Sequence, residues 1–435
     1  MSDRTGAAAD TAIDAAAAAA EVATAAGGWT RAGRHAGIAG AAIGVVAAGA
    51  AAGVAIERLT VGRGIRRRAR LALDAAGPYG TLRGTPGTAV AEDGTQLHYE
   101  IDEPGDGPAG RAGRGGHDDR GDRGGKGGGT GAARRKRLLG LLGRRSEAPT
   151  VVFCHGYCLN QDAWHFQRAA LRGAVRSVHW DQRSHGRSER GRAQREGAEP
   201  VTIDLLGRDL KAVLDATVPE GPIVLVGHSM GGMTVMALAD QYPEFVAERV
   251  VGVALIGTSA GRLSEVAFGL PSLGVKAFHR LAPGVLKALG SQSELVEKAR
   301  RATADLFAGL VKRYSFGTPK EVDPGVARFA ERMIEATPID VVAEFFPAFA
   351  VHDKTEALTA FDLVPALVLA GDRDMLTPPD HSDAIAELLP GAESVREEGA
   401  GHLVMLERAE TVTGLLETLI ERAAATAAGT RSARA

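Results

Sequence analysis

Short apolar runs that end at turn residues recur along the chain from residue 151 onwards. Runs of about four to eight apolar residues with such boundaries are typical of buried strands. Helix-like stretches follow some of these runs, for example at 233–239. The pattern predicts a fold of buried strands and helices. The expected strands lie at residues 151–154, 223–226, 249–256 and 367–370, with a more polar one at 394–398.

The run at 223–226 leads directly into the pentapeptide Gly-His-Ser-Met-Gly at residues 227–231, and a helix-like stretch follows it. A strand, a tight turn and a helix in this order are the context of a nucleophile elbow. A serine hydroxyl is a weak nucleophile until such a turn holds it out towards a histidine that can take its proton. Ser229 is therefore the predicted nucleophile.

The same G-x-S-x-G pattern occurs a second time, at residues 257–261, after another expected strand. The residues that follow distinguish the two copies. Two glycines follow Ser229 and allow a helix to pack close to the strand, whereas an arginine and a less regular stretch follow Ser259. We expect Ser259 to be a strand-end residue near the same pocket.

An acid and a base for this serine are expected downstream, in the chain order Ser, acid, His. The strand at 367–370 ends in a turn that carries Asp372 and Asp374. Asp374 lies further from the strand and is the expected acid, whereas Asp372 is expected to hydrogen-bond the local backbone. The alternative is that both carboxylates only shape the turn. His402, on a glycine-flanked loop after the strand at 394–398, is the expected base.

Ester cleavage also needs donors for the oxyanion of the transition state, and loss of one donor typically costs about 3 kcal/mol of barrier. The strand at 151–154 ends in His155 and Gly156, after which a turn can aim a backbone N–H at the serine. The N–H groups of Tyr157 and Met230 are the expected pair. Taken alone, the His-Gly pair is also consistent with an ordinary strand-to-helix turn.

Five features occur in the order that one family uses. They are a hairpin at 90–97, the His-Gly pair, Asp-Gln-Arg-Ser-His-Gly-Arg-Ser at 181–188, the serine pentapeptide, and Gly-Asp-Arg-Asp followed by Gly-His. Through them residues 85–426 resemble the α/β-hydrolase superfamily, in its serine-nucleophile esterase and lipase branch. The resemblance implies a mostly parallel eight-stranded α/β-hydrolase sheet flanked by helices, with the site at the carboxyl ends of the strands.

Two positions qualify the resemblance. Serine at the elbow argues against the branches that open epoxides or carbon–halogen bonds, because those branches place aspartate there. Ser184 departs from the family, which often has glycine at this turn. That difference concerns the geometry of the turn and leaves the expected chemistry unchanged.

Residues 261–361 interrupt a hydrolase core expected over 85–260 and 362–426, at the place where this family inserts a helical cap. Amphipathic helices are expected at 293–310 and 326–336. Nine of the 12 phenylalanines fall in the cap, which favours an apolar acyl pocket. Packing of the cap itself is the alternative for any one of them. The candidate substrate contacts are His155, Gly156, Phe268, Phe345 and Phe346.

The expected function is hydrolysis of a carboxylic ester with a hydrophobic or lipid-like acyl group. Ser229 would carry the acyl group, with His402 as the base and Asp374 orienting it. No metal and no organic cofactor is expected. The same triad could instead serve acyl transfer, haloperoxidase-like perhydrolysis, or thioester or carbon–carbon bond cleavage. An alternative from another class is a catalytically silent, membrane-tethered binding module on a hydrolase scaffold.

Length and composition agree with this assignment. The 435 residues, 45% of them hydrophobic, are enough for a large core. A net charge of -2 gives no reason to expect nucleic acid as a partner. Cys154 and Cys158 are the only two cysteines, too few for a disulfide framework or a zinc site, so free thiols in a reducing compartment are expected.

The chain outside the hydrolase core has a different composition. Residues 1–35 are an alanine-rich tail, and residues 36–56 run without a charge over a length that can span a bilayer. The basic segment 57–84 predicts that the hydrolase domain stays in the cytoplasm. Signal cleavage with secretion, or a mobile tail on a cytoplasmic protein, are the alternatives. A disordered insertion is expected over 105–148 and a tail over 427–435.

Cell fractionation tests the predicted anchor. The intact chain is expected in the membrane fraction, because the uncharged run at 36–56 is long enough to cross a bilayer. A soluble, N-terminally shortened protein in the medium would refute the anchor and indicate a cleaved signal peptide instead.

Overall fold

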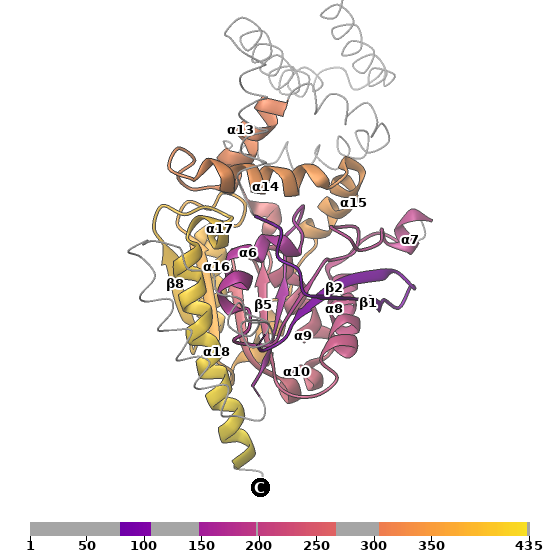
Figure 1. The fold of residues 1–435 in the computed structure, drawn as a ribbon, viewed down its shortest axis with the longest axis vertical. Coiled ribbons are helices and arrows are strands. Elements are labelled where there is room, and N and C mark those ends of the chain that lie inside the picture. The colour runs from indigo at the N-terminus through magenta and orange to yellow at the C-terminus, as the bar shows by residue number, and fades with distance from the viewer. Residues whose placement is uncertain (1–78, 106–147, 197–198, 267–303, 433–435) are drawn as a thin grey trace, which may run out of the picture. The chain divides into compact units, whose positions relative to one another are not determined.

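The computed structural model describes residues 79–105, 148–196, 199–266 and 304–432, which are coloured in Figure 1. All of them belong to the compact unit Gly62–Ala435. The predicted membrane span, the alanine-rich tail, nearly all of the expected insertion and Phe268 lie outside the described residues. Within the described ranges, no helix combines the length and the apolar character that crossing a bilayer requires.

The described residues form one eight-stranded sheet with the order β1-β2-β4-β3-β5-β6-β7-β8. β2 pairs antiparallel with β1 and β4, and the other neighbours are parallel. The predicted α/β-hydrolase sheet is confirmed, and so is the hairpin that joins its first two strands. The strands are β1 Thr85–Val90, β2 Gln96–Asp102, β3 Thr150–Cys154, β4 Ser177–Trp180, β5 Ile223–His228, β6 Val250–Ile256, β7 Ala366–Gly371 and β8 Glu393–Glu397.

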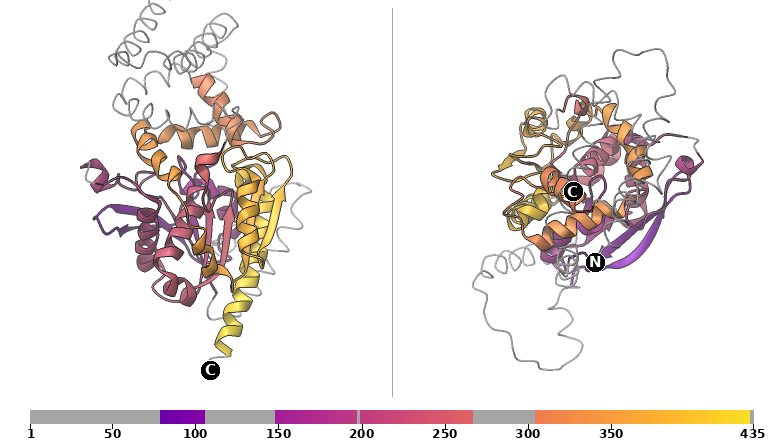
Figure 2. Two further views of the ribbon diagram at one scale, coloured as in Figure 1. Left: turned by 180° about the vertical axis from the view of Figure 1, so that it is seen from behind. Right: turned by 90° about the horizontal axis from the view of Figure 1, so that it is seen from above.

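Helices cover both faces of the sheet (Figure 2), which explains why its central strands are apolar throughout. Along β3, Val151 and Phe153 pack into one core, and Val152 and Cys154 pack into the other, because successive side chains of a strand point to opposite faces. The first core includes residues of α6 (His165–Leu171), α17 (Val404–Glu407) and α18 (Ala409–Ser432). The second includes residues of α8 (Ile203–Thr217), α9 (Met230–Gln241), α10 (Pro243–Arg249) and α16 (Pro379–Leu388).

The remaining described elements are short, apart from the cap. They are α7 (Arg192–Arg195) and the 3-10 turns η1 (Gln161–Trp164), η2 (Leu263–Glu265) and η3 (Glu356–Phe361). Helix α18 continues to Ser432, so the tail expected from residue 427 begins as part of a helix.

Three cap helices are described between β6 and β7: α13 (Ala304–Ser315), α14 (Pro324–Ala336) and α15 (Ile339–Ala350). α14 covers the helix expected at 326–336, and the one expected at 293–310 lies partly outside the described residues. The carboxylate of Asp323 caps α14 by accepting from two N–H groups of its first turn. The three helices lie over one end of the sheet (Figure 1). Residues of all three line a cavity together with Ser229.

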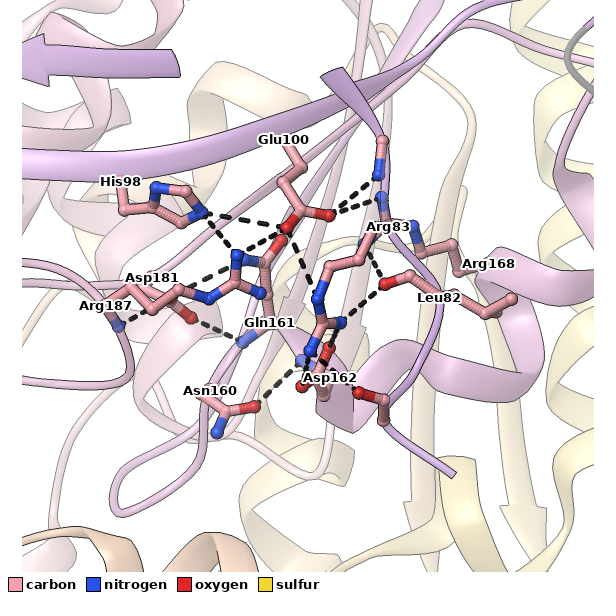
Figure 3. Close-up of polar contacts among 12 residues, drawn as sticks. Leu82, Arg83, His98, Glu100, Asn160, Gln161, Asp162, Arg168, Asp181 and Arg187 are labelled. Carbon is pink, nitrogen blue, oxygen red and sulfur yellow. Dashed lines mark hydrogen bonds and ion pairs between the residues drawn. The ribbon is translucent and has the colours of Figure 1, made fainter. Parts of the chain in front are cut away.

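A buried ion-pair network fastens the antiparallel edge of the sheet (Figure 3). Arg168 of α6 donates from Nε to Asp102 at 2.7 Å and from Nη2 to Glu100 at 2.8 Å. Glu100 also accepts from Nη1 of Arg187 at 2.6 Å. Charges this deeply buried are tolerated only when they are paired and hydrogen-bonded. The network therefore ties β2 to α6 and to the loop that follows β4.

Replacing Arg168 with leucine is expected to lower the free energy of unfolding by about 3–5 kcal/mol, because Asp102 and Glu100 lose their shared buried counter-charge. Urea denaturation followed by circular dichroism measures the change. Arg396→Met is the matched control, since it breaks an exposed pair with Asp383 and should barely move the midpoint. Equal losses in the two variants would contradict the importance of the buried network.

Candidate active site

Ser229 lies at the turn between β5 and α9, with φ 53° and ψ -121°. A positive φ is sterically costly for a residue with a side chain, so it persists only where the surroundings hold it. Here the Ser229 N–H donates to the carbonyl of Ile256 at 2.9 Å, and the Ser229 carbonyl accepts from the Thr258 hydroxyl at 2.7 Å. The tight turn predicted from the pentapeptide is present.

The two glycines of the pentapeptide permit a very close approach between segments. A Cβ at Gly231 would lie 2.2 Å from the carbonyl oxygen of Cys154 at the end of β3. A Cβ at Gly227 would lie 2.6 Å from the carbonyl oxygen of Gly231. Side chains at these positions would push α9 away from the sheet. The start of α9 therefore rests directly on the end of β3.

His402 joins Ser229 to Asp374. Its Nε2 lies 3.0 Å from Ser229 Oγ, and its Nδ1 lies 2.8 Å from Asp374 Oδ2. An ionised carboxylate only accepts hydrogen bonds, so Nδ1 carries the proton and Nε2 is left to accept one from the serine. Side chains that follow three different strands, β5, β7 and β8, thus converge as expected, and all three are buried.

The Asp374 carboxylate is held by its own loop. Its Oδ1 accepts from the N–H groups of Leu376 and Thr377 at 2.8 and 3.0 Å, and its Oδ2 accepts from the Thr377 hydroxyl at 2.8 Å. Burial alone would raise its pKa, but the positive charge that His402 carries when protonated prevails together with the hydrogen bonds from His402, Leu376 and Thr377, and the pKa is lowered. Asp372 instead accepts from a backbone N–H of the loop after β8, at 2.7 Å.

Thr377 is a site residue that the sequence analysis missed. Its hydroxyl lies 3.3 Å from His402 Nδ1 as well as within hydrogen-bond distance of Asp374. The spacing Asp-x-x-Thr could have indicated it, because an aspartate often accepts from the backbone N–H groups two and three residues further on.

The expected oxyanion donors lie next to Ser229. Met230 is the first residue of α9, and N–H groups in the first turn of a helix have no intrahelical acceptor. Tyr157 follows Gly156, where a Cβ would lie 3.1 Å from Ser229 Cβ. Among the described residues, neither N–H donates to a backbone carbonyl of another segment. Both groups are therefore available to a ligand.

A neutral histidine holds the turn that contains Tyr157. His185 Nε2 accepts from the N–H of Cys158 at 3.2 Å, and His185 Nδ1 donates to the carbonyl of Arg183 at 2.9 Å. Burial lowers the pKa of His185 to about 3, so the ring stays neutral and can act as this acceptor. Cys158 itself has φ 58°, which makes the turn tight.

The rest of the 181–188 loop supports this turn. The Asp181 carboxylate accepts from the N–H of Gln161 at 2.8 Å, and Arg183 forms a two-pronged ion pair with Asp209. Ser184 has φ 64°, a conformation that glycine adopts more easily. The departure from the family pattern is thus accommodated within the same kind of turn.

A cavity of about 360 Å³ lies beside Ser229 and His402, between the sheet and the cap. Phe346 lines it, as expected, and so does Phe349. The apolar lining also includes Met233, Leu263, Val311, Ile334 and Leu403.

Three expected substrate contacts lie outside this lining. Phe345 is buried, and its ring packs against that of His185 at a centroid distance of 4.9 Å. His155 is fully buried, and both of its ring nitrogens are satisfied there. Its Nε2 accepts from the N–H of Gln182, and its Nδ1 donates to the carbonyl of Gly156. The His-Gly pair therefore supports the turn and does not face the cavity.

Ser259 lies three residues beyond the end of β6, next to Thr258, whose hydroxyl bonds the Ser229 carbonyl, but Ser259 does not line the cavity beside Ser229. Its Oγ hydrogen-bonds the carbonyl of Gly261 and lies 2.8 Å from His381 Nδ1. It is fully buried and borders a separate cavity of about 500 Å³. Unlike Ser229, it has no positive φ. The second copy of the pattern is therefore not an elbow.

Residues 149–409 match the family described as alpha/beta hydrolase fold, and the chain belongs to this family of enzymes. It is 28% identical over 271 residues to a bifunctional esterase/perhydrolase of Acinetobacter calcoaceticus, covering 61% of this chain and 89% of that protein. It is 27% identical over 272 residues to an sn-1-specific diacylglycerol lipase of Mus musculus, covering 61% and 78%. A solved thermophilic esterase of Thermogutta terrifontis shares the fold with a TM-score of 0.53 at 22% identity, over 78% of this chain and 98% of that one.

Substituting alanine for Gly231 is expected to lower the hydrolysis of p-nitrophenyl esters at least about 100-fold, because the added methyl group must displace the elbow from the end of β3. Initial rates on the folded variant, checked by circular dichroism, measure the effect. Gly309→Ala is the control, since among the described residues no heavy atom beyond its own stretch of α13 lies within 4 Å of the methyl group it adds. Activity of Gly231→Ala within about twofold of wild type would contradict the close-approach argument.

Proposed function

We propose that the chain is a serine hydrolase that cleaves carboxylic esters through an acyl-enzyme intermediate. The observation that carries the proposal is the pair of hydrogen bonds that runs from Ser229 through His402 to Asp374. A serine, a neutral imidazole and a carboxylate in this order are the groups that acyl transfer needs.

In the first half of the reaction, Ser229 Oγ attacks the carbonyl carbon of the ester while His402 Nε2 takes the serine proton. The carbonyl oxygen becomes an oxyanion, which accepts from the N–H groups of Tyr157 and Met230. Collapse of this intermediate breaks the bond to the alcohol, which leaves with the proton from His402. Asp374 remains ionised and stabilises the imidazolium.

In the second half, His402 takes a proton from water, and the resulting hydroxide oxygen attacks the acyl group on Ser229. The same two N–H groups stabilise the second oxyanion. The proton then returns from His402 to Ser229 Oγ, and the carboxylic acid is released. Positioned proton transfer typically contributes about 10²–10⁴-fold to the rate, and one oxyanion donor about 10²–10³-fold.

For the substrate, we propose an ester with a hydrophobic acyl group. The support is the apolar lining of the cavity next to Ser229, to which the cap contributes Phe346 and Phe349. Apolar surface withdrawn from water stabilises a bound alkyl chain by roughly 25 cal/mol per Å². The similarity to a diacylglycerol lipase is consistent with such a substrate.

Perhydrolysis is a second candidate, favoured by the similarity to a bifunctional esterase/perhydrolase. In that reaction hydrogen peroxide replaces water in the second half and releases a peracid from the same acyl group on Ser229. Peracid formation in the presence of an ester and peroxide distinguishes it from simple hydrolysis.

For location, we propose attachment to a membrane through residues 36–56, with the hydrolase domain on the cytoplasmic side. This part of the proposal rests on the uncharged run and the basic residues that follow it in the sequence.

A fluorophosphonate probe tests the nucleophile, because it phosphonylates only an activated serine. Wild type and Ser259→Ala are expected to be labelled, and Ser229→Ala is expected to lose both labelling and ester hydrolysis, by about 10⁴-fold or more in rate. Gel fluorescence and mass spectrometry of the labelled peptide measure this. Loss of the label in Ser259→Ala alone would overturn the assignment.

A further inference from the structure

The side chain of Tyr157 joins the oxyanion turn to the cap. Its hydroxyl donates to the backbone carbonyl of Val342 in α15. Its ring lies against two further residues of that helix, with centroid distances of 5.0 Å to Phe349 and 6.3 Å to Phe345. One residue therefore holds the cap through a hydrogen bond and through aromatic packing.

The carbonyl of Val342 can serve both its own helix and Tyr157. In an α-helix this carbonyl faces the N–H of Phe346, four residues further on. A backbone carbonyl oxygen has two lone pairs, so it can accept a second hydrogen bond, which the Tyr157 hydroxyl supplies.

The backbone on both sides of Tyr157 is held as well. The N–H of Cys158 donates to His185 Nε2, and the N–H of Leu159 donates to the carbonyl of Gly156 at 3.2 Å. The hydroxyl of Tyr157 is anchored on α15, and hydrogen bonds hold the backbone next to it. These contacts together restrict the direction of the Tyr157 N–H. The direction of that N–H is thus coupled to the position of α15.

The same helix meets the expected position of the acyl chain. Tyr157, Phe346 and Phe349 all line the cavity beside Ser229. An alkyl chain that fills this cavity touches α15 at Phe346 and Phe349, and Phe349 also packs against the Tyr157 ring. A short acyl group, such as acetyl, does not extend that far from the serine.

We propose that Tyr157 is a positioning residue, through which contact between the acyl chain and α15 aligns the oxyanion donor. The inference rests on the proposed function, since it takes this N–H to meet an oxyanion. Binding energy from a remote part of a substrate raises kcat when it orients the reacting groups. The enzyme accordingly distinguishes long from short acyl chains in kcat more than in KM.

Tyr157→Phe removes the hydroxyl and keeps the ring. With p-nitrophenyl decanoate we expect kcat to fall about tenfold and KM to change less than about twofold, while kcat for p-nitrophenyl acetate falls by a clearly smaller factor, about threefold or less. Affinity for decylboronic acid, which forms a tetrahedral adduct with the serine, should fall about tenfold, and affinity for decanoate should not. Steady-state kinetics and inhibition constants provide these values.

A control variant completes the test. Tyr242→Phe changes a tyrosine at the C-terminal end of α9 and should match wild type with both esters. Equal loss of kcat for both esters, or a change confined to KM, would overturn the positioning role.

Failure of this inference is distinguishable from failure of the proposed function. If Ser229→Ala keeps its turnover, the proposed function is wrong and the inference falls with it. If Ser229→Ala is inactive while Tyr157→Phe equals wild type on decanoate, the hydrolase assignment stands and only the positioning role is wrong.

Discussion

The site depends on a contact between the start of α9 and the end of β3 that has no room for a side chain. The carbonyl oxygens of Cys154 and His155 lie 2.2 and 2.7 Å from the Cβ position of Gly231. This approach places the strained turn of Ser229 against Gly156, so that N–H groups from two distant segments become neighbours. Helices on both faces of the sheet supply the close packing that holds such a turn in place.

Buried histidines serve as neutral hydrogen-bonding groups around this contact. Burial lowers the pKa of His155 to about 4, and that of His185 and His228 to about 3. As neutral rings, the first two can each accept a backbone N–H, and His228 Nε2 donates to the carbonyl of His402 at 2.8 Å. His402 differs because a carboxylate, Asp374, faces its Nδ1. The three neutral histidines therefore have structural roles, and His402, which faces a carboxylate, has the proposed catalytic role.

The cap is joined to the core by the helix that also lines the cavity. Arg190 pairs with Asp340 and Glu344 in the first part of α15, and the Tyr157 hydroxyl binds the carbonyl of Val342, which lies between them. Residues further along the same helix face the cavity beside Ser229. Anchoring and the proposed substrate contact therefore fall on one element. Under the proposed function, the position of α15 would influence which acyl groups react.

The sequence by itself determined several of the strands, the elbow at Ser229 and the strand ends that carry Asp374 and His402, because each of these signals lies within a few consecutive residues. The arrangement of eight strands in one sheet came from the resemblance to the α/β-hydrolase superfamily. Only the tertiary structure decided that Ser259 borders a different cavity, and that Phe345 packs inward while its neighbour Phe346 faces the pocket. The cavity beside Ser259 is lined by residues that follow β6 and by α16, whereas the placement of the two phenylalanines depends on how α15 is rotated against the core. That rotation is set by contacts between segments far apart in the chain, which no local pattern of residues encodes.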